Sequence, residues 1–215
     1  MTIPSRPDFD TRAAQWDQLP RRVALANAVV DAIRQITEPQ ATMRLLDYGA
    51  GTGLVTLGLQ PFVGEVIAVD SSRGMLEQLE LKARESGITN LQTQFIDLDH
   101  EWQLPAGIDL LVSSMTMHHV TDITGLMFHF KACMNPGGRL CIADLEEEDG
   151  TFHDDQAAPI PHHGFSLNQI EHYFHEAGFT SVSTRRIMTV VKERDEQRRE
   201  YPVNLTVGTV GPALD

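Results

Sequence analysis

Two patterns of hydrophobic and polar positions take turns along this chain. Short apolar runs that suit buried strands occur at about 43–48, 66–70, 91–96, 108–113 and 139–144. Between them, apolar positions recur with helical spacing at about 52–60, 73–86 and 121–134. Strands and helices that alternate with short links predict a mostly parallel sheet covered by helices on both faces.

The N-terminal part is predicted to be helical. Between residues 13 and 36, apolar side chains recur at spacings of three, four or seven, and Pro20 can divide this stripe into two pieces. Residues 1–12 are polar and carry two prolines, so we expect a loose or docking arm there. We interpret residues 1–40 as an N-terminal helical arm of a single domain that spans residues 1–215.

The C-terminal part departs from this alternation. A polar, acidic and histidine-bearing loop occupies 145–164, and a helix is expected at about 167–177. Two strands follow at 182–191 and 203–210, joined by a charged link at 192–200, so we expect an antiparallel hairpin at one sheet edge. The Asn-Pro-Gly-Gly run at 135–138 predicts a turn before the fifth strand.

Composition narrows the possible partners. The formal net charge is −13, which argues against nucleic acid and anionic membrane surfaces as partners. The two cysteines give no disulfide framework, the first 25 residues lack a signal-peptide core, and no apolar run reaches the roughly 18 residues of a membrane span. We expect a cytoplasmic protein, and its oligomeric state is left open.

The most informative stretch is 45–53, with the sequence Leu-Leu-Asp-Tyr-Gly-Ala-Gly-Thr-Gly. It predicts a strand that ends in a turn almost free of side chains, followed by a helix whose N-terminal N–H groups face a ligand. Asp70 ends the next strand, where a carboxylate can accept hydrogen bonds from both hydroxyls of a ribose. Alternatively, Asp70 merely caps the helix that follows it.

Two classes of ligand compete for this glycine loop. A dinucleotide-binding loop has the spacing Gly-x-Gly-x-x-Gly, whereas here the third glycine comes one residue early and Leu54 takes its place. The spacing therefore speaks against a nicotinamide-dependent oxidoreductase, which we keep as the second hypothesis. A non-catalytic cofactor-binding module is the third.

The ordered set of motifs resembles that of class I S-adenosylmethionine-dependent methyltransferases of the small-molecule type. Over roughly residues 13–210, the resemblance involves the first motif, the strand with the ribose acid, the adenine motif and the fourth and fifth strands, at 47–53, 66–70, 95–97, 109–113 and 140–144. It implies a doubly wound, Rossmann-like α/β fold with seven strands, mostly parallel, with an antiparallel C-terminal hairpin strand. It also implies methyl transfer from S-adenosylmethionine to a small molecule by in-line displacement, releasing S-adenosylhomocysteine.

The resemblance also implies which residues hold the cofactor. Backbone at Gly49, Gly51 and Gly53 would approach the methionine part, and Asp47 would lie near its ammonium group. Asp70 would hold the ribose. The adenine would pack on Met75, and Asp97 would accept a hydrogen bond from its amino group. The rest of the expected cofactor set is Ala50, Ser71, Leu98, Ser113 and Trp16; Trp16 stands where the family often has an aromatic residue, but plain core packing suits it equally well.

Acceptor chemistry is expected on loops at the carboxyl ends of the strands. The catalytic candidates are His118 and His119, after the fourth strand, and His163 in the acidic loop. If the acidic loop at 144–166 covers the pocket, it favours an amine-bearing acceptor; a solvated surface loop is the alternative. Histidines and carboxylates also suit a metal, but no such pair lies on a clear helix beside a third ligand, so we expect no metal site.

Overall fold

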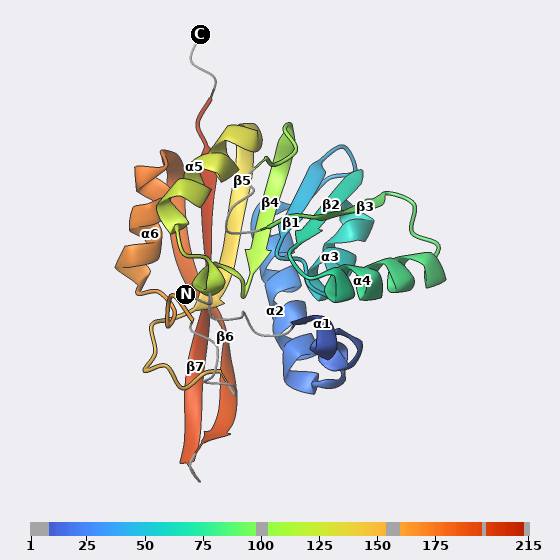
Figure 1. Cartoon of the computed structure of the whole chain (residues 1–215). Helices are drawn as coiled ribbons and strands as arrows, with labels where there is room; N and C mark the ends of the chain where they lie inside the picture. The colour runs from blue at the N-terminus through green and yellow to red at the C-terminus, as the bar shows by residue number, and fades with distance from the viewer. Residues whose placement is uncertain (1–8, 98–102, 154–159, 195–196, 213–215) are drawn as a thin grey trace, which may run out of the picture.

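A seven-stranded sheet organises the computed structural model, which describes residues 9–97, 103–153, 160–194 and 197–212 (Figure 1). Its order is β3-β2-β1-β4-β5-β7-β6. Strand β7 pairs antiparallel with β5 and with β6, and the other pairs are parallel, so the predicted fold is confirmed. The strands are β1 (Arg44–Tyr48), β2 (Glu65–Asp70), β3 (Leu91–Phe95), β4 (Ile108–Ser114), β5 (Met134–Leu145), β6 (Phe179–Arg194) and β7 (Gln197–Val210).

Helices cover both faces of the sheet. Strand side chains alternate in direction, so Leu45 and Val66 pack on one face with helices α2 and α3, whereas Leu46 and Ile67 pack on the other with α5 and α6. Helix α4 joins the first face through contacts of Leu79. The bounds are α2 (Pro20–Thr37), α3 (Leu54–Leu59), α4 (Arg73–Glu85), α5 (Ile123–Cys133) and α6 (Leu167–Glu176), with short 3₁₀ turns η2 (Gln60–Phe62) and η3 (Met117–His119).

The N-terminal stripe forms two pieces, as predicted. Pro20 is the first residue of α2, where a missing N–H costs nothing, and the 3₁₀ turn η1 (Ala13–Gln18) precedes it. Part of the predicted loose arm is ordered, because residues 9–12 form the short helix α1 (Phe9–Arg12). Residues 1–8 lie outside the described residues.

Two predicted links are strand instead. The run at 135–138 lies within β5, as an irregularity in its pairing with β4, and Gly137 there has a φ of +78°. The charged link at 192–200 mostly continues β6 and β7, with Lys192 opposite Arg199 and Glu193 opposite Arg198. Charged residues fit these strands because the hairpin projects beyond the rest of the sheet (Figure 1), and most of the side chains at 191–193 and 197–200 are exposed.

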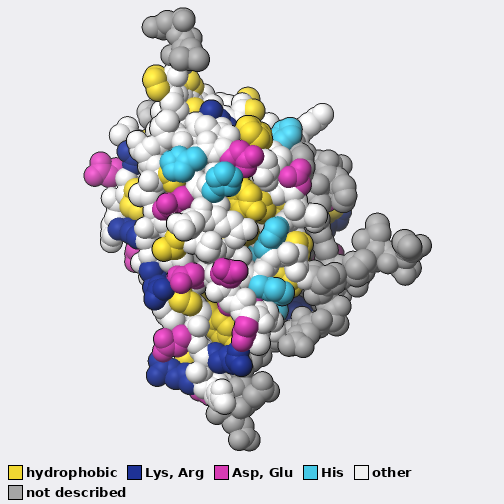
Figure 2. All heavy atoms as spheres, turned by 90° about the vertical axis from the view of Figure 1, so that its left-hand side faces the viewer, with side chains coloured by type: hydrophobic (Ala, Val, Ile, Leu, Met, Phe, Trp, Pro, Cys, Tyr) yellow, Lys and Arg dark blue, Asp and Glu magenta, His cyan; other side chains and the backbone are white. Residues whose placement is uncertain are grey.

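Figure 2 shows the face that carries α6, where histidine and acidic side chains are scattered among apolar ones. Side chains of both charge signs are interspersed towards the hairpin end of this face. Within the described part of the chain, no helix has the length and apolar character to cross a membrane. Cys133 and Cys141 are buried free thiols, and burial raises their pKa values to about 11 and about 12.

Candidate active site

A cavity of about 590 Å³ lies at the carboxyl ends of β1, β2 and β4, where ligands bind in open α/β sheets. The glycine loop after β1 forms one part of its wall. The N-terminal helices and the segment after β4 form other parts, and the loop after β5 contributes residues on the far side. We call the two ends the glycine half (47–52 and 70–75) and the histidine half (114–121, 152 and 153).

Backbone hydrogen bonds fix the shape of the glycine loop. The N–H groups of Gly49 and Ala50 both donate to the carbonyl of Val69, at 2.9 and 3.0 Å, which ties the loop to β2. Gly49 has a φ of +77°, and a Cβ there would lie 2.2 Å from Thr116 Oγ1. Glycine is therefore required at 49, because the loop must pass directly against the segment after β4.

Gly51 faces open space. Its φ is +56°, and a Cβ built on it meets nothing within 4 Å, so bare backbone borders the cavity there. Gly53 has a different role from the one expected. It does not line the cavity, and a Cβ there would meet Leu79 Cδ1 at 2.2 Å, so it allows the start of α3 to approach α4.

Asp47 is a buried carboxyl in the wall of the glycine half. It is 2% exposed and accepts a hydrogen bond of 2.5 Å from Thr56 Oγ1. Burial raises its pKa from 3.8 to about 7; the Thr56 hydroxyl lowers it and the nearby Asp70 charge raises it again. A carboxyl held in this way gains from a cation placed beside it in the cavity.

Asp70 joins the two loops of the glycine half. One oxygen accepts from Gly51 N–H at 2.7 Å and the other from Ser72 N–H at 2.8 Å. Burial raises its pKa, and these backbone donors lower it. The cap of α4 is Ser72, which accepts from Met75 N–H, so Asp70 does not itself cap that helix.

The N-terminal segment closes the glycine half from outside. Asp10 Oδ1 accepts from Ser72 Oγ at 2.6 Å and from Gly74 N–H at 2.8 Å, which fixes α1 on the start of α4. Phe9 and Trp16 contact each other edge to face and line the cavity. Trp16 is only partly buried, so its placement supports the cavity interpretation over plain core packing.

A buried pair of side chains anchors the histidine half. His118 Nδ1 lies 2.6 Å from Asp144 Oδ1, and both side chains are almost fully buried. The same carboxylate also accepts from the N–H groups of Leu145 at 2.7 Å and His118 at 3.4 Å. A carboxylate there selects the tautomer with a proton on Nδ1, which leaves the Nε2 lone pair of His118 for the cavity.

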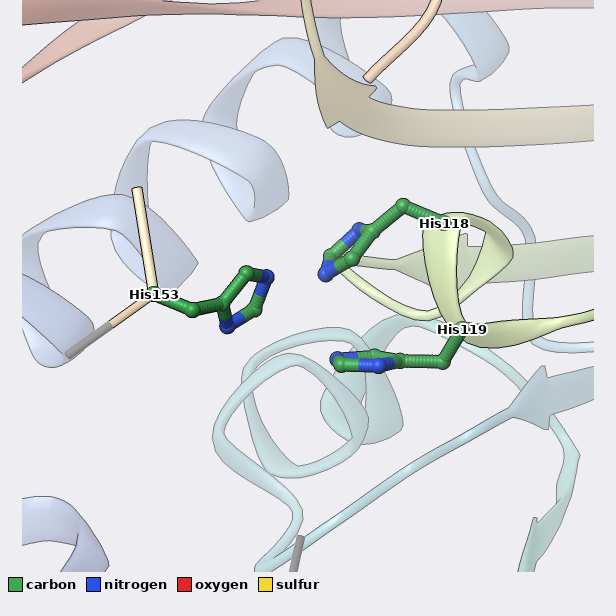
Figure 3. A group of neighbouring side chains, drawn as sticks. All are labelled: His118, His119 and His153. Atoms are coloured by element: carbon green, nitrogen blue, oxygen red, sulfur yellow. The ribbon is translucent and has the colours of Figure 1, made fainter. Parts of the chain in front are cut away.

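His119 and His153 complete this half. Figure 3 shows the rings of His118, His119 and His153 pointing toward one another, two from η3 and one from the loop after β5. Their ring centroids lie 4.1 to 5.2 Å apart. His153 belongs to the predicted acidic loop, and nothing local in the sequence relates it to residues 118–119.

Besides Gly53, three expected site residues do not line the cavity, and a fourth lies outside the described residues. His163 is exposed, 3.8 Å from Glu148, and does not line the cavity, so its expected catalytic role is not supported. Ser113 is fully buried within β4, and the next residue, Ser114, lines the cavity instead because neighbouring side chains point to opposite faces. Asp97 follows β3 without lining the cavity, and Leu98 lies outside the described residues.

Comparison with known proteins agrees with this geometry. A family model described as "Methyltransferase domain" matches residues 16–184, which is most of the chain. The chain therefore belongs to the methyltransferase domain family, and the resemblance to class I S-adenosylmethionine-dependent methyltransferases is confirmed.

Two curated relatives illustrate the range of this similarity. An uncharacterised methyltransferase of Schizosaccharomyces pombe is 29% identical over 154 residues, which is 65% of this chain and 54% of that protein. Aklanonic acid methyltransferase DauC of Streptomyces is 25% identical over 147 residues, 67% of this chain and 66% of that protein. The chain thus spans about half to two thirds of the length of these relatives.

Solved structures share the fold. The YcgJ protein of Bacillus subtilis superposes with a TM-score of 0.69 at 17% identity, covering 87% of this chain and all of that one. Phosphoethanolamine N-methyltransferase 2 of Haemonchus contortus, solved with S-adenosyl-L-methionine, has a TM-score of 0.70 at 15% identity, covering 86% of this chain and 52% of that one.

Proposed function

We propose that this chain transfers a methyl group from S-adenosylmethionine to a small-molecule acceptor, with residues 1–215 acting as one domain. The observation that carries the proposal is the continuity of the cavity. Ten of the residues expected from the sequence line a single space that runs from the glycine half to the histidine half: Trp16, Asp47, Gly49, Ala50, Gly51, Asp70, Ser71, Met75, His118 and His119.

The glycine half suits this cofactor. The backbone at Gly51 borders open space, so an amino-acid moiety can lie against it. The buried Asp47 carboxyl would gain an ammonium partner, and Asp70 stands at the end of β2, where its carboxylate would accept hydrogen bonds from a ribose diol. When bound, the cofactor supplies an electrophilic methyl group. The chain positions this group and excludes water from it.

The histidine half suits the acceptor. Asp144 holds His118 so that its Nε2 lone pair is directed into the cavity, where it can take a proton from an acceptor. A small acceptor is in keeping with relatives such as DauC, whose name refers to aklanonic acid. The amine-bearing acceptor that the acidic loop suggested gains no such support.

In the described part of that loop, the acidic side chains form ion pairs and hydrogen bonds with other groups of the protein. Glu146 pairs with Arg186, Asp149 pairs with Arg199, and Glu148 accepts from the N–H groups of Thr151 and Phe152. None of these acids lines the cavity, whereas the basic side chains of Arg12, Arg21, Arg22 and Lys192 do. Apart from Asp47 and Asp70 in the glycine half, the Asp, Glu, Lys and Arg side chains in the described walls are all basic, so an anionic or neutral acceptor fits these walls better than a cationic one.

Titration calorimetry with S-adenosylhomocysteine tests the cofactor assignment, with NADH as the matched control. We expect binding of the first and none of the second. Binding of NADH alone would favour the oxidoreductase alternative. Release of S-adenosylhomocysteine with any member of an acceptor library would rule out a non-catalytic module.

A further inference from the structure

Three imidazoles meet at one point of the histidine half. One ring nitrogen from each of His118, His119 and His153 lies within 4.8 Å of the other two (Figure 3). His118 is 1% exposed, and the other two rings are partly buried, so the point lies inside the protein at the cavity wall.

Asp144 prepares the first of these rings. It accepts from His118 Nδ1, so the nitrogen that remains for a ligand is Nε2. A carboxylate that holds the other nitrogen of a metal-binding histidine fixes the ring and makes it a stronger donor. Here Leu145 N–H holds that carboxylate in turn, at 2.7 Å.

The hairpin of β6 and β7 holds the third ring in place. Tyr201 Oη donates to the carbonyl of Thr151 at 3.1 Å, and Lys192 Nζ donates to the carbonyl of Phe152. The Phe152 ring packs against Tyr201 and against His153 itself. Side chains from β6 and β7 therefore fix the part of the loop that carries His153.

We propose that His118, His119 and His153 bind one divalent transition-metal ion, and that the ion receives the methyl acceptor through an oxygen-donor pair such as a carboxylate beside a hydroxyl or keto oxygen. The acceptor part rests on the proposed methyltransferase function, and the metal part does not. Three protein ligands leave positions open for a small molecule, which is the pattern of catalytic metal sites.

The ligand set limits the choice of metal. Neutral imidazole suits zinc, iron, cobalt, nickel and copper, whereas magnesium and calcium prefer oxygen ligands. Bonds of about 2.0–2.1 Å in a tetrahedral zinc site place ligand nitrogens roughly 3.3–3.4 Å apart. Nitrogens that already lie within 4.8 Å need only small side-chain rotations to reach that geometry.

A metal at this point would ionise the acceptor. If the acceptor binds through a hydroxyl oxygen, the ion would lower the pKa of that hydroxyl, so its proton would pass to water and leave the oxygen as an anion in the cavity. Arg21 and Lys192 also line the cavity, and their charge favours an acceptor with a carboxylate. In this arrangement the His118 lone pair holds the metal and does not take the acceptor's proton.

Metal content of protein purified without a histidine tag tests the proposal. We expect about one ion per chain after dialysis against zinc or cobalt, and a visible absorption band with cobalt that reports its low-coordinate site. His119→Ala and His153→Ala should each weaken metal affinity at least 100-fold in competition with a chromophoric chelator. His163→Ala, a histidine of the same loop outside the cluster, should leave it unchanged.

Two outcomes would overturn the metal site: wild-type protein that retains no ion, or a His119→Ala/His153→Ala double variant that binds the ion as tightly as wild type. Calorimetry with S-adenosylhomocysteine in excess chelator distinguishes failure of the metal site from failure of the proposed methyltransferase function. Retained cofactor binding without metal binding rejects only the metal, and turnover that survives chelation assigns the His118 lone pair to proton transfer. If S-adenosylhomocysteine binds neither to the metal-loaded protein nor to the protein in excess chelator, the methyltransferase function is rejected.

Discussion

The two halves of the cavity are built in different ways. The glycine half consists of two short stretches at the ends of the neighbouring strands β1 and β2, 47–52 and 70–75, joined by the hydrogen bond from Gly51 N–H to the Asp70 carboxylate. The histidine half gathers residues from η3, from β5 and from the loop after it, and the β6–β7 hairpin holds that loop in place. The proposed cofactor site is therefore local in the sequence, whereas the proposed acceptor site depends on tertiary structure.

The two halves meet where Gly49 passes Thr116, and Gly49→Ala should have the largest effect of any single change. The new Cβ would lie within 2.7 Å of three Thr116 atoms, and alanine disfavours a φ of +77°. Overpacking and backbone strain together cost about 2–4 kcal/mol. We expect S-adenosylhomocysteine affinity to fall roughly 100-fold by calorimetry, with a lower Tm.

A second change at the same contact provides the control. Thr116→Gly in the Gly49→Ala background removes all three clashing atoms and should restore part of the affinity and of the Tm. An affinity of the single variant within threefold of wild type would contradict the idea that this contact shapes the glycine loop.

This difference in construction explains what the sequence could and could not predict. The alternation of strands and helices and the position of the glycine loop follow from apolar runs and glycine spacing, and the structure places Asp47, Gly51 and Asp70 together as expected. Gly53 and Ser113 are expected at the cofactor but do not line the cavity. A motif does not show whether a glycine faces a ligand or a neighbouring helix, or which of two adjacent serines faces the cavity.

The histidine half could be predicted only in part. The sequence predicts His118 and His119 as candidates because they follow a strand end, and it predicts the exposed His163 as well. It does not relate His153 to them, because the position of His153 depends on the hairpin. The hairpin is also longer than the sequence predicts, because the charged residues at 192–200, which are expected to form a link, mostly continue the two strands. Long-range packing of this kind leaves no local signal in a single sequence.

Asp144→Asn should break the histidine half and spare the glycine half. The amide can present an N–H group to His118 Nδ1 and so select the wrong tautomer. We expect turnover, measured as S-adenosylhomocysteine release with an acceptor found by library screening, to fall about 10–100-fold. Cofactor affinity should stay within twofold.

Glu147→Gln is the matched control for this change, because Glu147 is an exposed acid of the same segment that does not line the cavity. Its turnover should equal that of wild type. If Asp144→Asn lowers cofactor affinity as strongly as turnover, the two halves do not act separately.

The pH dependence of cofactor binding should report on the glycine half alone. Burial raises the pKa of Asp47 to about 7, so the carboxyl of the free protein ionises near neutral pH, and an ammonium partner requires the ionised form. Affinity for S-adenosylhomocysteine should therefore drop about tenfold from pH 8 to pH 6. Calorimetry at several pH values measures this slope, and Asp47→Asn should flatten it.

Stability should show the opposite sign. A carboxyl whose pKa is higher in the folded protein than its ordinary 3.8 favours folding while it is protonated. This contribution is complete below pH 4 and is lost as pH rises to about 7. Without cofactor, Asp47→Asn should thus have a higher Tm than wild type at pH 8 and lose that advantage near pH 4. A lower Tm at pH 8 would show that the charge is already compensated.

The smallest effect is expected at the outer wall of the glycine half. Asp10→Ala removes the acceptor of Ser72 Oγ and Gly74 N–H, the two bonds that fix α1 on the start of α4. The site is exposed, so the loss is about 1 kcal/mol, and affinity for S-adenosylhomocysteine should fall about threefold to tenfold. Gln15→Ala, at an exposed position of the neighbouring turn η1, is the control. Because Phe9 also touches the His119 ring edge to face, detachment of α1 should disturb both halves at once, and turnover should fall together with affinity. An Asp10→Ala variant that loses affinity but keeps full turnover at saturating cofactor would show that α1 serves the glycine half alone.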